Sequence, residues 1–267
     1  MLRVVNCLVE GVSVRATERL TGVHRDTILR ILQVVGDGCG KLLNEHIRRV
    51  HAKCVQVDEI WTYVFKKQGH LDDDDDAKMG DQYVFVAIDA DTKLAISHLV
   101  GKRSAESAFN LMRDLQARVV NRFQLTTDGF QPYLNAVEDN FGADIDYATL
   151  VKMYSNDRHE TASPAWYGPA KVTCAMPQPI MGQPAWEHIS TSYIERRNLT
   201  MRMQRFTRLT NAFSKKLDNL KAQIALHFAH YNWCRVHRTL RVTPAMEAGL
   251  ATHVWSPTEL LGERHTG

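Results

Sequence analysis

Apolar positions recur every three to four residues through the first fifty positions, which predicts short amphipathic helices. The predicted helices cover residues 2–10, 14–21, 25–35 and 41–50. Ser13 caps the second helix, and Gly22 makes the turn that follows it. The sequence Gly-Asp-Gly at 36–38 predicts the end of the third helix, because glycine is a poor helix former.

From residue 54 the pattern changes to runs of β-branched and aromatic residues, which predict strands. The predicted strands cover residues 54–65, 83–89, 94–100, 123–127 and 145–153. Helices at 104–120 and 131–140 separate the last three strands. The order strand-strand-strand-helix-strand-helix-strand predicts an α/β fold with a mixed five-stranded sheet flanked by helices. Residues 155–190 contain five prolines and predict an irregular insertion.

The segment 192–216 contains no glycine or proline and predicts a long helix. On a 3.6-residue period, Glu195 heads a largely apolar stripe. The other members of that stripe are Leu199, Arg202, Met203, Phe206 and Leu209. Arg197, Arg205 and Arg208 fall on the opposite side. A metal ion would compensate the inward carboxylate, and a nucleic acid would suit the outward arginines. A further helix is predicted over residues 216–236.

Charge is distributed unevenly along the chain. The net charge is +3, but residues 1–53 carry +4, residues 54–194 carry −8 and residues 195–267 carry +7. Basic ends favour contact with a polyanion, although unevenly spread solvated charge is the simpler alternative. No apolar run approaches the ~20 residues of a membrane span. Five cysteines without paired spacing indicate reduced thiols, so we expect a cytoplasmic protein without membrane contact.

The sequence ATERLTGVHRDTILRIL (residues 16–32) is similar to a DNA-binding helix-turn-helix. In such a unit the second helix enters the major groove. Arg25, Thr27 and Arg30 would then be exposed to DNA. The alternative is a small helical bundle that contacts no DNA.

Three acids are candidates for sharing metal ions. Asp58 lies within the first predicted strand, Asp128 follows the fourth strand, and Glu195 heads the long helix. Three such acids can hold two divalent cations about 4 Å apart, one for the attacking oxygen and one for the leaving oxygen. Magnesium prefers hard carboxylate oxygens.

Three motifs carry a family resemblance: VDEIW (57–61), TTDGFQPY (126–133) and YIERRNLTMRMQRFTRLTNAFSKK (193–216). They resemble the catalytic blocks of the bacterial insertion-sequence-one transposases, within the wider DDE transposase and integrase superfamily. The resemblance covers residues 54–233. It implies an RNase H-like sheet in which Asp58, Asp128 and Glu195 are the catalytic metal ligands. Two Mg²⁺ ions would be bound, with Mn²⁺ as a substitute.

The same resemblance implies further DNA-binding residues. Asn198 and Arg202 would contact a DNA phosphate or orient the glutamate, and Arg205 lies on the outward side of the helix. His237 and Arg238 resemble a segment that follows the glutamate helix in many DDE enzymes, although a helix-end interaction is an equal alternative. Glu59 and Trp61 are assigned no chemistry.

The expected protein is therefore an insertion-element transposase with two domains and a tail. Residues 1–50 would form a helix-turn-helix DNA-binding domain, residues 54–250 an RNase H-like DDE catalytic domain, and residues 251–267 a tail. It would bind double-stranded DNA, namely terminal inverted repeats and target DNA, as a homodimer or higher assembly. In a bacterial cytoplasm it would join the nucleoid when bound to DNA.

Two alternatives use the same scaffold. One is a catalytically inactive, domesticated DNA-binding regulator, against which the intact set of acids counts. The other is an RNase H-like nuclease acting on RNA–DNA hybrids, against which the helix-turn-helix counts, because such units read the major groove of B-form DNA.

Overall fold

The structure of the chain is a computed structural model that describes residues 1–154, 172–196 and 214–262. Its helices are α1 (Leu2–Val9), α2 (Val14–Thr21), α3 (Arg25–His46), α4 (Ala105–Gln116), α5 (Pro132–Phe141), α7 (Leu217–Trp233), α8 (Pro244–Glu247) and α9 (Pro257–Leu260). Its strands are β1 (Cys54–Val64), β2 (Gly80–Asp89), β3 (Ala95–Gly101), β4 (Gln124–Thr127), β5 (Asp146–Tyr154) and β6 (Val172–Met181). Two 3₁₀ turns, η1 (Gln68–His70) and η3 (Trp186–His188), complete the described elements.

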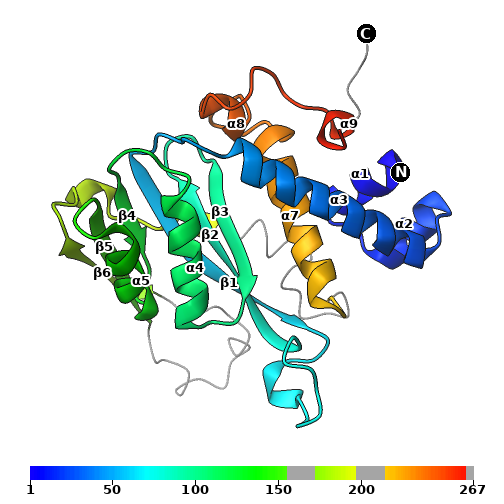
Figure 1. Cartoon of the computed structure of the whole chain (residues 1–267), viewed down its shortest axis with the longest axis horizontal. Helices are drawn as coiled ribbons and strands as arrows, with labels where there is room; N and C mark the ends of the chain where they lie inside the picture. Colours follow the sequence, from blue (N-terminus) through cyan, green and yellow to red (C-terminus); the bar gives the residue numbers. More distant parts are fainter. Residues whose placement is uncertain (155–171, 197–213, 263–267) are drawn as a thin grey trace.

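One mixed sheet organises the fold, with the strand order β3-β2-β1-β4-β5-β6 (Figure 1). The first three strands form an antiparallel meander. β4 and β5 then add in parallel on the other side of β1. The carboxyl ends of β1, β4 and β5 therefore meet at the same edge of the sheet.

The prediction of five strands is wrong, because β6 adds a sixth. It lies within the segment predicted to be irregular on account of its prolines, and it pairs antiparallel with β5. Pro177 and Pro179 fit because β6 is an edge strand, where a missing N–H can face away from the sheet.

Helices cover the sheet and pack at its β3 edge. Figure 1 shows α4 and α5 on one side of the sheet, while α3 crosses α7 beyond β3. Buried side chains of these helices and of the sheet form one continuous core. At the β3 edge, the buried Asn232 side chain donates to the Ala95 carbonyl and accepts from the Ala95 N–H. Within the described residues, no helix is both long and apolar enough to cross a membrane.

The third helix is longer than predicted. α2 begins at the predicted Ser13 cap and ends at Gly22, which has a φ of 70°. α3 then continues through Gly36 to His46 in place of two separate helices. The reason is tertiary packing: a Cβ at Gly36 would lie 2.5 Å from Ala222 of α7. Gly36 therefore allows two helices to approach closely and does not end one.

The predicted long helix is described only at its ends. Residues 192–196 are helical, as predicted. Residues 197–213 lie outside the described residues, and the predicted apolar stripe beyond Glu195 lies there with them. Residues 214–216 are not helical, so the predicted end at Lys216 is wrong. Ser214 instead pairs with the end of β1, where its carbonyl accepts the Phe65 N–H at 3.0 Å.

Candidate active site

Strand register brings Asp58 and Asp128 together. β1 and β4 are parallel, with Gln56 paired to Thr126. Asp58 and Asp128 each follow this pair by two residues. The two acids therefore lie at the same level, at the edge where the parallel strands end. β4 ends at Thr127, and Asp128 occupies the turn beside β1, where its Oδ1 accepts the Phe130 N–H at 3.0 Å.

Glu59 completes a group of three acids. One carboxylate oxygen from each of Asp58, Glu59 and Asp128 lies within 4.8 Å of the others. Neighbouring strand residues point to opposite faces of a sheet. Asp58 and Glu59 nevertheless both reach Asp128, because Asp128 lies beside the edge of β1. Among the described residues, this is the group that offers three ligand atoms to one ion.

Glu59 is held by two side chains from the α4–α5 side. The Arg103 guanidinium contacts its Oε1 at 2.6 Å, and the Tyr133 hydroxyl donates to its Oε2 at 3.2 Å. The Glu59 side chain is only 5% exposed. Arg103 also lies 3.8 Å from Asp128 Oδ2 and stacks 4.0 Å from the centre of the Phe130 ring. Arg103 therefore joins two of the three acids.

Among the residues that the structure describes, acids outnumber bases at this edge. Burial raises the pKa of Glu59, and the nearby Asp128 carboxylate raises it further, against the opposing effect of Arg103. Burial likewise raises the pKa of Asp128, although the Phe130 N–H, Arg103 and Lys152 lower it. Glu59 and Asp128 therefore retain their protons more strongly than usual, chiefly because burial disfavours the charged form. A bound divalent cation would stabilise the charged form of both side chains.

Glu195 lies near these acids but is not part of the three-acid group. Its helix is tied to β1 through Gln56, whose Oε1 accepts the N–H groups of Tyr193 and Ile194 at 3.0 and 3.1 Å. Gln56 and Asp58 share one face of β1, so this bond brings the helix to the Asp58 side. The Glu195 carboxylate contacts the ammonium of Lys152 and the hydroxyl of Thr191.

The predicted DNA-binding residues fall into three groups. Arg25, Thr27 and Arg30 are exposed at the start of α3. Arg238 is exposed, and His237 is half-buried in the turn after α7, where its ring lies 3.0 Å from the Thr239 hydroxyl. The third group, Asn198, Arg202 and Arg205, lies outside the described residues.

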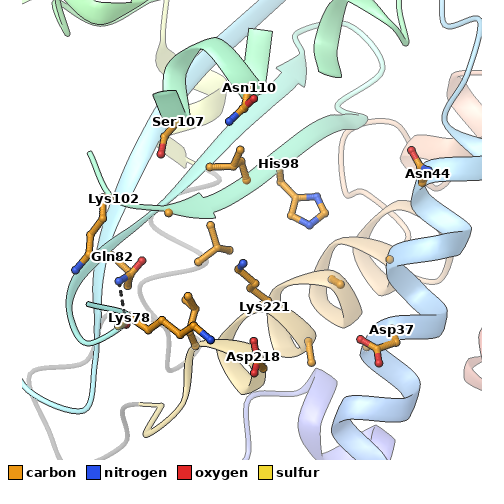
Figure 2. A pocket seen from close by; sticks show the side chains of 18 of the residues that line it. Asp37, Asn44, Lys78, Gln82, His98, Lys102, Ser107, Asn110, Asp218 and Lys221 are labelled. Atoms are coloured by element: carbon orange, nitrogen blue, oxygen red, sulfur yellow. Dashed lines mark hydrogen bonds between the residues drawn. The ribbon is translucent and has the colours of Figure 1, made fainter. Parts of the chain in front are cut away.

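A separate cavity of about 1310 Å³ lies along the β3 edge, between α3, α4 and α7 (Figure 2). Lysines and acids both line it, and none of Asp58, Glu59, Asp128 and Glu195 does. His98 of β3 projects into it and stacks on Phe228, with 4.8 Å between ring centres. This cavity is therefore distinct from the acidic site.

Sequence reasoning missed Glu59, Arg103 and Lys152. Glu59 stands beside Asp58 in a quoted motif, but strand alternation argues against two neighbours serving one site. Arg103 and Lys152 follow no pattern that would mark them, since each reaches the acids only through the pairing of strands far apart in sequence.

Comparison with known proteins gives little further information. No protein-family model matches the chain, and no curated protein matches it. Among solved structures, a cryo-EM structure of the piggyBac transposase synaptic complex with hairpin DNA superposes with a TM-score of 0.36 at 11% identity. The match covers 79% of this chain and 51% of the other, so the chain spans about half the length of that protein. A likeness at this level carries no argument about function.

Proposed function

We propose that the protein is a DDE-type transposase of the insertion-sequence-one kind, which cuts and joins double-stranded DNA with divalent metal ions. The observation that carries the proposal is the convergence of Asp58, Glu59 and Asp128 at the carboxyl edge of a mixed sheet. The strand order supports an RNase H-like fold, in which phosphoryl transfer depends on acids at this edge.

The residues at this edge fit a divalent metal. The group consists of carboxylate oxygens, which are the hard ligands that Mg²⁺ and Mn²⁺ prefer. Burial raises the pKa values of Glu59 and Asp128, and a bound cation would stabilise their charged forms. Asp58, Glu59 and Asp128 would hold the metal, with Glu195 as the further ligand proposed from the family motif. Two bound ions supply an activated water and charge neutralisation to phosphoryl transfer.

Protein side chains prepare this site. Arg103 and Tyr133 fix both oxygens of Glu59. The Phe130 N–H donates to Oδ1 of Asp128, and Oδ2 takes no part in that bond. Held carboxylates need little rearrangement when charge develops on a phosphate, and such preorganisation is a major source of catalysis.

DNA contact is assigned to the two basic parts of the chain. Arg25, Thr27 and Arg30 would bind terminal inverted repeats as part of an N-terminal helix-turn-helix domain at 1–50, which their exposure on α3 supports. His237, Arg238, Asn198, Arg202 and Arg205 would contact the DNA near the cleavage point. Pairing of two element ends implies a homodimer or higher assembly on DNA.

The test is strand cleavage of a labelled terminal-repeat duplex, taken from the DNA that flanks the gene, with Mg²⁺ or Mn²⁺. Asp128→Asn should abolish cleavage while duplex binding stays within about twofold. The matched control is Asp139→Asn, which removes the same charge from an exposed position of α5 and should leave cleavage unchanged.

Two outcomes would overturn the proposal. If Asp128→Asn still cleaved the duplex, the cluster of Asp58, Glu59 and Asp128 would not be the catalytic site. Binding without cleavage or metal uptake in the wild-type protein would favour the inactive DNA-binding regulator.

A further inference from the structure

Lys152 links the acids that the family motif assigns to catalysis. Its ammonium contacts the Glu195 carboxylate and donates to the Thr191 hydroxyl at 3.1 Å. Thr191 donates to the same Glu195 oxygen, which fixes the pair in place. The positive charge of Lys152 also interacts with Asp58 and Asp128. The Lys152 ammonium therefore contacts Glu195 and lies near enough to Asp58 and Asp128 to interact with their charges.

The position of Lys152 follows from the sheet. β5 pairs with β4 up to Thr149, opposite Thr127. Lys152 lies three residues further along β5, past the end of β4, where the turn containing Asp128 leaves the sheet. The Lys152 side chain is 21% exposed, so part of it faces solvent. Arg103 approaches the acids from the α4–α5 side, and Lys152 approaches them from the side of Glu195.

Lys152 and Thr191 contact the same oxygen of Glu195, Oε1. A metal ion bound through that oxygen would repel the ammonium and compete with it for the carboxylate. The lysine stem is long and flexible, and its head group is a compact charge suited to phosphate. Once released, this charge would lie at the acidic edge, where the DNA backbone has to approach.

We propose that Lys152 is the counter-ion of Glu195 in the metal-free protein and binds a DNA phosphate oxygen once metal displaces it from that carboxylate. This inference rests on the proposed function, because it assumes that metal and DNA meet at this edge. Lys152 affects metal binding as a positioning residue, through Glu195. It contacts the DNA only when the metal is bound.

The first measurement is calorimetric titration of Mn²⁺ into the full chain. Lys152→Met should bind Mn²⁺ roughly fivefold more tightly than wild type, since an ion pair of ordinary strength no longer competes. Lys152→Arg, which keeps the charge, should stay within twofold of wild type. Lys66→Met is the matched control, because Lys66 also pairs with two carboxylates, Asp72 and Asp75, but in the loop that follows β1.

The second measurement is the salt dependence of duplex binding, with Ca²⁺ and with a chelator. Loss of one phosphate contact lowers the slope of log K against log salt by about 0.9. With Ca²⁺, the slope for Lys152→Met should be lower than that of wild type by this amount. With the chelator, the two slopes should be equal. For Lys66→Met, the difference in slope from wild type should not depend on whether Ca²⁺ or the chelator is present. Lys152→Gln repeats both measurements should Lys152→Met melt at a lower temperature than wild type.

The outcomes separate the two proposals. Unchanged or weaker Mn²⁺ binding by Lys152→Met and Lys152→Gln overturns the role of Lys152, while metal-dependent cleavage by the wild type would still support the transposase. A slope reduction that persists in the chelator also overturns the displacement. A wild-type protein that binds no metal overturns the proposed function and this inference together.

Discussion

The guanidinium of Arg103 lies 2.6 Å from the Glu59 carboxylate, and that carboxylate is almost wholly buried. A buried carboxylate without a partner is costly, because water no longer solvates it. Arg103 therefore favours the charged form of Glu59 against burial and the nearby Asp128, both of which raise the pKa of that carboxyl.

Removing Arg103 should destabilise the metal-free protein. We expect Arg103→Leu to lower the free energy of unfolding by about 2 kcal/mol, since an unpaired buried charge remains. The double variant Arg103→Leu/Glu59→Gln should recover part of the loss. Urea unfolding of the four proteins in this cycle measures the coupling. If Arg103→Leu and the double variant were equally stable, the Glu59 carboxylate would cost nothing without Arg103, and the prediction would be wrong.

Neutralising Asp128 should stabilise the metal-free protein. Burial raises the pKa of Asp128, so the folded state binds protons more tightly than the unfolded state does. The stability that Asp128 contributes is therefore present at low pH. It is lost as the pH rises through the pKa of Asp128 in the unfolded state and then in the folded state.

Asp128→Asn should unfold at higher urea than wild type at pH 7 in chelator. The gain should be about 0.5–1 kcal/mol, because the side chain is partly exposed to screening solvent. It should vanish below about pH 4, where the carboxyl is protonated in both states. A variant that is less stable than wild type at pH 7 would contradict the raised pKa of Asp128.

Close helix packing makes Gly36 sensitive to substitution. Gly36→Ala places a methyl group 2.5 Å from Ala222, and we expect a loss of roughly 1–3 kcal/mol in thermal or urea unfolding. Gly38→Ala is the matched control in the same helix, because no atom lies within 4 Å of the added Cβ. That change should stabilise the protein by about 0.5–1 kcal/mol. Similar effects at both positions would argue against the α3–α7 contact.

The His98 side chain should make stability depend on pH below neutrality. Burial, with repulsion from Arg118, lowers its pKa from 6.5 to about 4. The unfolded state therefore binds more protons between these values, and stability falls as pH drops across that window. The expected loss is roughly 1–3 kcal/mol. His98→Leu should flatten the dependence, whereas the change His51→Leu at an exposed position should leave it unaltered.

The sequence predicts most of the scaffold because local patterns agree with the tertiary structure there. β-branched runs identify β1 to β5, and Ser13 and Gly22 set the limits of α2. Two of the misjudged elements, α3 and β6, are decided by non-local contacts. Gly36 lies within a helix where Ala222 leaves no room for a side chain, and β6 tolerates its prolines because it is the edge strand of the described sheet.

The candidate site is predicted only in part, for a similar reason. Asp58 and Asp128 stand in elements whose ends a parallel sheet brings together. Glu59 joins them although strand alternation places it on the other face of β1, and its carboxylate still lies within 4.8 Å of the other two. Arg103 and Lys152 come from a loop and a strand whose distances to the acids depend on the whole strand order.

Gln56 has a consequence for how Glu195 can change partners. Its single amide oxygen holds two consecutive N–H groups at the start of the 192–196 helix. Swivelling that helix would break both bonds at once and leave a buried acceptor empty. The backbone is therefore held at this point, and a change of partner by Glu195 would have to come from rotation of side chains rather than from movement of the helix.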